Sequence, residues 1–194
     1  MYSKIQYISS GDTAEEQLQN IIAVLEKGIT WVQLRFKTED SLSLLALAKQ
    51  IKQLQRTYNF IYIINDHIDI ARTVDADGVH LGLEDESIDI ARIKLGDKKI
   101  IGGTANTLQD ILQRVDERCD YIGVGPLRFT KTKKNLSPTL GFKGYQQLFE
   151  QLKDRSVPPL FAIGGVRYDD IDVLSKIGLY GVAMSKELEI PTAD

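Results

Sequence analysis

Eight short apolar runs, rich in valine, isoleucine and tyrosine, alternate with amphipathic stretches along the 194 residues. The runs cover residues 5–9, 31–36, 60–65, 78–82, 99–105, 121–126, 160–165 and 181–185. Most are apolar almost throughout, which is typical of strands in a parallel sheet that is covered on both faces. The stretches between them have the apolar spacing of helices, and we expect helices over residues 14–27, 40–58, 68–74, 88–95, 108–115, 145–152 and 169–177.

This repeated alternation predicts right-handed crossovers, and eight strands are enough to close a parallel sheet around a filled interior. An open doubly wound sheet shares the alternation, but polar residues and glycines follow several runs rather than one switch point. We therefore predict a single-domain (β/α)8 TIM barrel over residues 1–194. Asp12 or Thr13, Thr107 and Asp169 are expected N-caps.

Only residues 186–194 follow the last run, so the final helix is expected to be shortened or missing. Such a gap would leave apolar surface beside the first and eighth strands, which a homodimer could cover. A net charge of -3 argues against nucleic acid as a partner. No run approaches the roughly 20 apolar residues of a membrane helix, and the N-terminus lacks a signal-peptide pattern, so we expect no membrane partner and a cytoplasmic protein.

The second run carries three long polar side chains at every second position: Gln33, Arg35 and Lys37. In a strand, this spacing places them on one side, and in a barrel that side faces the axis. An arginine fork and a lysine point charge suit a bound diphosphate. The alternative is that they face the helices or solvent, which their apolar neighbours disfavour.

Two carboxylates follow neighbouring runs. Asp66 comes directly after the third run, and Asp85 lies just beyond the fourth. Carboxylates close to a diphosphate are the usual ligands of Mg²⁺, whereas the single Cys119 and two histidines give no zinc pattern. The alternative is that Asp66 only caps the next helix. His80 is expected to be a hydrogen-bonded interior residue rather than a base.

Two further segments suggest phosphate binding. Gly164 and Gly165 close the seventh run, and Ser185 closes the eighth, where barrels of this kind commonly bind phosphate through backbone N–H groups. Residues 128–143 form a long polar segment with four lysines. It could close over bound phosphates or be a solvated surface loop, and the sequence leaves both interpretations open.

Taken together, these segments resemble the thiamine phosphate synthase family and its close relatives, the thiazole tautomerases. The resemblance rests on residues 32–37, 64–66, 77–82, 120–126, 130–133, 162–166 and 181–185, together with Asp85. It covers almost the whole chain and implies that hydroxymethylpyrimidine diphosphate and hydroxyethylthiazole phosphate are joined, giving thiamine monophosphate and diphosphate.

The resemblance also implies a role for each matching residue. Arg35, Lys37, Asn65 and Lys133 would hold the diphosphate, and Asp66 and Asp85 would hold Mg²⁺. Gln33 would lie beside the pyrimidine, and Thr104 near the pyrimidine or the diphosphate. The thiazole phosphate would be bound by Thr130, Thr132, Gly165, Met184 and Ser185. Of these, Arg35, Lys37, Lys133 and Thr104 are the expected catalytic residues.

The chain departs from the family pattern at several positions. Asn106 stands where the family usually has a histidine, which is the proposed acid/base of the tautomerases, and asparagine cannot titrate. Leu83 replaces a common glutamine, and Ser9 and Ser10 replace a common Thr-Asp pair. We therefore favour the synthase, with a tautomerase-like or non-catalytic thiamine-intermediate-binding barrel as alternatives.

Overall fold

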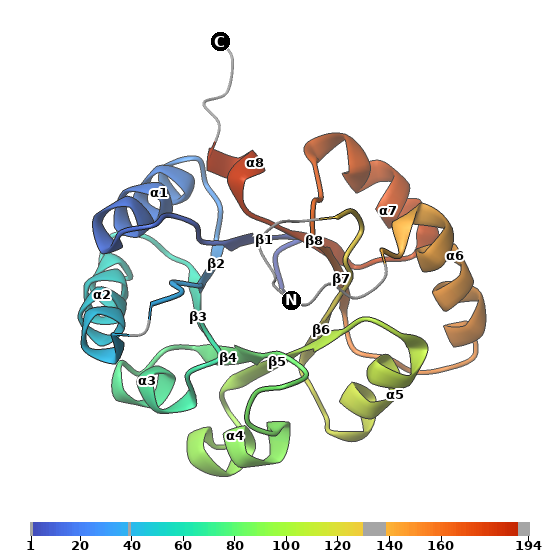
Figure 1. Ribbon diagram of the computed structural model, residues 1–194, viewed down its shortest axis with the longest axis horizontal. Helices are drawn as coiled ribbons and strands as arrows, with labels where there is room; N and C mark the ends of the chain where they lie inside the picture. The colour runs from blue at the N-terminus through green and yellow to red at the C-terminus, as the bar shows by residue number, and fades with distance from the viewer. Residues whose placement is uncertain (1, 39, 130–138, 190–194) are drawn as a thin grey trace.

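Eight parallel strands close into a barrel in the computed structural model, which describes residues 2–38, 40–129 and 139–189 (Figure 1). The strands are β1 (Ile5–Ile8), β2 (Trp31–Leu34), β3 (Ile61–Asn65), β4 (Gly78–Leu81), β5 (Ile100–Ala105), β6 (Tyr121–Val124), β7 (Leu160–Ile163) and β8 (Gly181–Met184). Each pairs in parallel with the next along the chain, and β8 pairs with β1. The predicted TIM barrel is confirmed.

A layer of helices surrounds the strands (Figure 1). They are α1 (Ala14–Glu26), α2 (Ser41–Leu54), α3 (Ile68–Thr73), α4 (Ile88–Leu95), α5 (Leu108–Asp116), α6 (Gly141–Leu152), α7 (Ile171–Ile177) and α8 (Lys186–Glu189). Thr13 and Thr107 cap α1 and α5 with reciprocal capping boxes, as predicted. The prediction for Asp169 is wrong, because Asp169 lies inside the 3-10 helix η1 (Tyr168–Asp170) that precedes α7.

The core has two parts. A large apolar layer lies between strands and helices, while Trp31, Ile63, Tyr121 and Phe161 fill the inside of the barrel. Tyr2 stacks on Trp31 with ring centroids 4.9 Å apart, and Trp31 meets Phe161 edge to face at 5.0 Å. The inside of the barrel, as formed by the described residues, is therefore a packed core and not a pore, so a ligand would have to bind outside it.

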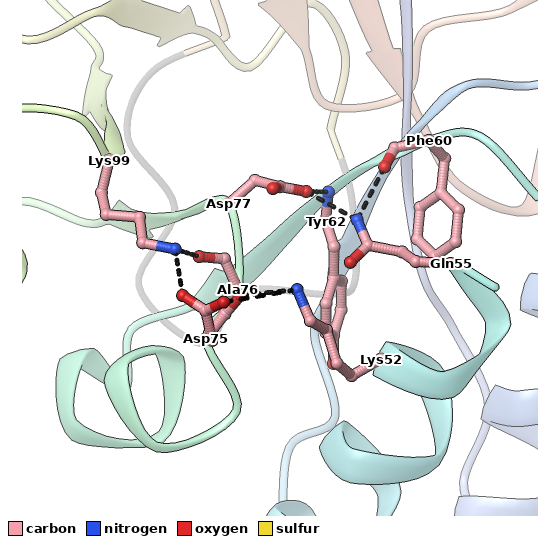
Figure 2. Close-up of polar contacts among 8 residues, drawn as sticks. All are labelled: Lys52, Gln55, Phe60, Tyr62, Asp75, Ala76, Asp77 and Lys99. Atoms are coloured by element: carbon pink, nitrogen blue, oxygen red, sulfur yellow. Dashed lines mark hydrogen bonds and ion pairs between the residues drawn. The ribbon is translucent and has the colours of Figure 1, made fainter.

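Polar contacts close the opposite, N-terminal end of β3, β4 and β5 (Figure 2). The Asp77 carboxylate, just before β4, accepts hydrogen bonds from the Tyr62 amide and from Gln55 Nε2, both at 2.7 Å. Lys99, just before β5, donates to Asp75 Oδ1 at 2.5 Å and to the Ala76 carbonyl at 2.7 Å. These contacts join strand starts to helix ends, so we assign this face to stability.

The final helix is shortened, as predicted. Glu189 on α8 accepts hydrogen bonds from the hydroxyls of Tyr7 and Ser10, each at 2.6 Å, and Lys27 Nζ donates to the Leu188 carbonyl at 2.9 Å. The expected apolar surface beside β1 and β8 is not found: in the described residues, large exposed apolar side chains lie on or near α2, α4, β6 and α7. Short as it is, α8 covers this edge.

Within the described ranges, every helix is too short or too polar to cross a membrane.

Candidate active site

Groups from three neighbouring strands meet at the C-terminal rim. Arg35 follows β2, Asp66 follows β3 and Asp85 lies in the turn after β4. Asp66 has a left-handed backbone with φ of 65°, which its amide supports by donating to the His80 carbonyl at 2.9 Å. Asp85 Oδ2 accepts the Gly82 amide at 2.6 Å, which fixes this turn. The structure thus brings both predicted carboxylates and the arginine together.

The two carboxyl groups influence each other strongly. Burial raises the pKa of Asp66 to about 7, and a hydrogen bond with Asp85 and the negative charge of Asp85 act in the same direction. Arg35 and the Asn65 side chain oppose this rise. Burial also lowers the pKa of Arg35, against the attraction of Asp66. Two carboxylates this close repel each other when both are ionised, and a divalent ion would offset that repulsion.

Lys37 does not lie on the strand as predicted. The sequence suggested a strand to residue 36, but β2 ends at Leu34, and Lys37 is exposed in the following loop. The reason is visible in Arg35, whose amide bonds to the buried Ser9 hydroxyl at 2.9 Å rather than to a neighbouring strand backbone. Gln33 alone of the three is a strand residue, and it is buried with 1% exposure.

Below the rim, a chain of hydrogen bonds runs across the barrel interior. Gln33 Nε2 donates to Gln6 Oε1 at 3.4 Å, and Gln6 Nε2 donates to the Tyr121 hydroxyl at 3.2 Å. His80 Nδ1 lies 3.1 Å from that hydroxyl, and His80 Nε2 lies 3.0 Å from Thr104 Oγ1. Neutral His80 donates through one ring nitrogen and accepts through the other, so it links the Tyr121 and Thr104 hydroxyls. His80 is thus an interior hydrogen-bonding residue, as predicted.

Arg114 joins two of these strand ends from outside. This arginine of α5 is only 3% exposed, and its guanidinium donates to the Thr104 carbonyl at 3.1 Å and to the Gly82 carbonyl at 2.8 Å. Its third partner is Glu117, at 2.7 Å. The buried charge is thus paired, and it fixes the ends of β4 and β5 relative to each other.

The glycine turn after β7 lies beside the end of β8. Gly164 and Gly165 have φ values of 86° and 67°, in the left-handed region that favours glycine. β7 pairs with β8 at Ile163 and Ala183, so Met184 and Ser185 follow one step beyond this pairing. Met184 is buried and Ser185 directly precedes α8. The predicted Thr130, Thr132 and Lys133 lie outside the described residues.

Asn106 has a structural role. Its side-chain amide donates to the Gly125 carbonyl, and its backbone amide donates to Asp110 at 2.8 Å. The residue therefore joins the ends of β5 and β6, and it offers no titrating group at the position where the tautomerases need one.

Comparison with known proteins bears directly on this arrangement. Residues 6–188 match the sequence profile of the family described as thiamine monophosphate synthase. The chain belongs to this family. It is 49% identical to the thiamine-phosphate synthase of Flavobacterium psychrophilum over 95% of the chain and 90% of that protein. The corresponding protein of Bacteroides thetaiotaomicron is 41% identical over 93% of the chain and 87% of its own length.

A solved structure shares the fold of this family member. Thiamine phosphate pyrophosphorylase from Pyrococcus furiosus superposes with a TM-score of 0.80 at 28% identity, covering 94% of the chain and 85% of that protein. The fold, the family and the sequence profile thus agree over nearly the whole chain.

The donor set at the rim fits Mg²⁺ better than a metal with an all-protein cage. The described residues contain no group of three or more histidine, cysteine or acidic side chains able to hold a metal. Two carboxylates with mutual repulsion are nonetheless what Mg²⁺ commonly uses, because substrate phosphate and water complete its octahedron.

Sequence reasoning missed the residues that support this site. Gln6 and Tyr121 are polar groups at inward positions of apolar strands, and Arg114 lies on the buried face of α5 beside Ile111. Each is a polar residue at a position where the apolar pattern of its strand or helix predicts a buried side chain. Nothing in the sequence distinguishes Arg128, the first residue of the polar segment 128–143.

Proposed function

We propose that this family member is a thiamine phosphate synthase, which joins hydroxymethylpyrimidine diphosphate to hydroxyethylthiazole phosphate and releases diphosphate. The observation that carries the proposal is the meeting of Arg35 with the Asp66–Asp85 pair at the rim. A diphosphate with its metal is the ligand class that such a mixed set of cation and acids suits. The relatives named above bear the same activity in their names.

The proposed roles follow the strand order. Arg35, Lys37 and Asn65 would bind the diphosphate, together with Lys133 from outside the described residues. Asp66 and Asp85 would hold Mg²⁺, which when bound neutralises charge on the diphosphate. Gln33 and Thr104 would contact the pyrimidine or the adjoining diphosphate. The thiazole phosphate would lie against Gly165, Met184, Ser185, Thr130 and Thr132.

The proposed reaction requires stabilisation of the diphosphate leaving group more than it requires a strong base. The aminopyrimidine can donate electrons to its methylene carbon, so the bond to the diphosphate oxygen breaks first. The thiazole nitrogen then bonds to the methylene carbon. The protein would bind the departing diphosphate with Arg35 and Lys37, align the second ring, and exclude water. The Thr104 hydroxyl shares a hydrogen bond with His80 Nε2, which would hold it in place beside the substrate.

The decisive experiment incubates the purified chain with both precursors and Mg²⁺ and quantifies thiamine phosphate and diphosphate. We expect equal amounts of the two products, no reaction when either precursor is omitted, and loss of activity with EDTA that Mg²⁺ restores. Arg35→Met should be folded and inactive. Folded wild-type protein that forms no thiamine phosphate would overturn the proposal, and binding of thiamine phosphate without turnover would instead identify a non-catalytic binder.

The tautomerase alternative gains no support, since Asn106 is engaged with Gly125 and cannot exchange a proton at working pH. A cytoplasmic setting and a homodimer stay part of the proposal. Light scattering across a concentration series would test the dimer.

A further inference from the structure

One ion pair holds the glycine turn after β7. The Arg128 guanidinium forks onto the Asp170 carboxylate, with Nη1 to Oδ2 at 2.5 Å and Nη2 to Oδ1 at 2.7 Å. Asp170 is only 5% exposed and also accepts the Arg167 amide at 2.7 Å. This pairing raises the pKa of Arg128 and lowers that of Asp170. A bidentate pair with one buried partner has a more defined geometry than a salt bridge between two exposed side chains.

The same arginine fixes the backbone of the turn. Arg128 Nη1 donates to the Gly165 carbonyl at 2.8 Å, and the Arg128 amide donates to the Gly164 carbonyl at 3.0 Å. One residue earlier, the Leu127 amide donates to the Ile163 carbonyl at 2.9 Å. Three successive carbonyls of the turn therefore point toward the segment that follows β6.

The amides of the turn must consequently point the other way. In a trans peptide, the carbonyl of one residue and the N–H of the next have opposite directions. The N–H groups of Gly165 and Val166 are therefore turned away from Arg128, and neither has a protein acceptor in the described residues. Free, parallel backbone amides in a left-handed turn are typical of anion sites.

Asp170 places a negative charge close to this turn, and without a partner it would repel a phosphate. Arg128 neutralises that charge and at the same time orients the carbonyls. The ring of Phe142 on α6 lies 5.6 Å from the guanidinium carbon and helps to fix its plane. Charge neutralisation and orientation of the carbonyls both depend on the bidentate guanidinium of Arg128, which lysine cannot reproduce.

We propose that Arg128 and Asp170 are positioning residues that set the affinity for the phosphate of the thiazole substrate, without touching that substrate. The inference rests on the proposed function and deepens it, because it assigns control of one substrate to a pair remote from the Asp66–Asp85 rim. Loss of Arg128 should weaken binding of the thiazole phosphate and leave binding of the pyrimidine diphosphate unchanged.

The test compares Arg128→Met, Arg128→Lys, Asp170→Asn and the Met/Asn double variant with wild type. Arg155→Met is the matched control, because it removes an exposed arginine at the end of α6. Each variant is first checked for folding by circular dichroism and thermal melting. The KM of each substrate is then measured separately with the other saturating, and the affinity for the thiazole phosphate is measured by calorimetry.

For Arg128→Met we expect the KM and Kd of the thiazole phosphate to rise about ten-fold, the effect of losing one charged hydrogen-bond network. The KM of the pyrimidine diphosphate and kcat should stay within about two-fold of wild type, by the same scale. The KM of Arg128→Lys for the thiazole phosphate should lie between those of wild type and Arg128→Met. The double variant should bind the thiazole phosphate more tightly than Arg128→Met, because the uncompensated Asp170 carboxylate is gone. The control should match wild type.

An equal rise in both KM values, or no rise in either, would overturn the inference while leaving the proposed function intact. Absence of turnover in wild type would instead reject the proposed function. In that case calorimetry still decides, since wild type that does not bind the thiazole phosphate more tightly than Arg128→Met contradicts the pair's role.

Discussion

Replacement of Asp66 by asparagine should make the metal-free protein more stable and the enzyme inactive. Asp66 is held against Asp85 in a partly buried position, where its pKa is raised to about 7. Asparagine keeps the shape, tolerates the left-handed backbone at this position and removes the charge. The substitution therefore relieves a repulsion that the wild-type protein retains for its metal.

The size of the effect follows from the pKa. A carboxyl with a pKa of about 7 when folded and 3.8 as a reference differs by about three pKa units, and each unit corresponds to about 1.4 kcal/mol. The ceiling is thus about 4 kcal/mol, and solvent screening of a partly exposed carboxyl reduces our expectation to about 2 kcal/mol.

The direction of the Asp66 pKa shift determines the pH range over which the destabilisation appears. Because the folded-state pKa lies above the unfolded one, the folded protein binds the proton more tightly. The destabilisation is absent at or below a pH of about 4, grows as the pH rises to about 7, and is complete above it. The free energy of unfolding of wild type should therefore fall relative to that of Asp66→Asn across this interval.

Urea titrations with EDTA at a series of pH values measure this difference, with the exposed Asp154→Asn as a control for removal of a carboxyl. Addition of Mg²⁺ should stabilise wild type and leave Asp66→Asn unchanged, since only wild type binds the ion. A difference that does not vary with pH, or an asparagine variant that is less stable at neutral pH, would refute the electrostatic reasoning.

Three other substitutions test separate parts of the barrel. Asp77→Ala should lower the free energy of unfolding in urea by about 2–3 kcal/mol, because the buried Tyr62 amide and Gln55 lose the Asp77 carboxylate as acceptor. The folded variant should keep its kcat, and a large loss of kcat would contradict a purely stabilising role. Tyr121→Phe should raise the KM of the pyrimidine diphosphate and cost about 1–2 kcal/mol, so unchanged values would show that the interior chain does not support the substrate. Gly165→Ala should raise the KM of the thiazole phosphate alone, because its φ is 67° and its new Cβ would lie 2.9 Å from a neighbouring side chain; normal kinetics would exclude the turn from that site.

The periodicity of the chain was sufficient to predict the barrel, because strand and helix patterns repeat locally and closure follows from their number. The rim was also predictable: Asp66 directly follows an apolar run, Asp85 lies just beyond the next one, and the ends of neighbouring parallel strands must meet. The sequence did not reveal that β2 ends before Arg35, because a buried Ser9 hydroxyl replaces a backbone partner there. That contact joins residues far apart in the chain.

The supporting residues were harder to predict for a related reason. Arg114 and Arg128 act on carbonyl groups of other loops, and a carbonyl is present at every position whatever the side chain. No residue type marks the partner, so only three-dimensional geometry shows it. The pair of Arg128 and Asp170 is separated by 42 positions, too far for any local pattern.

The hydrogen-bonded chain inside the barrel has a consequence for the choice of substrate. It runs from Gln33 through Tyr121 to Thr104 across the barrel interior, which is packed with the aromatic residues of the inner core. If the pyrimidine binds beside Gln33 as proposed, it can enter only to this level, and analogues lengthened along the barrel axis should not fit. New substituents would instead have to point sideways, toward the loops of the rim.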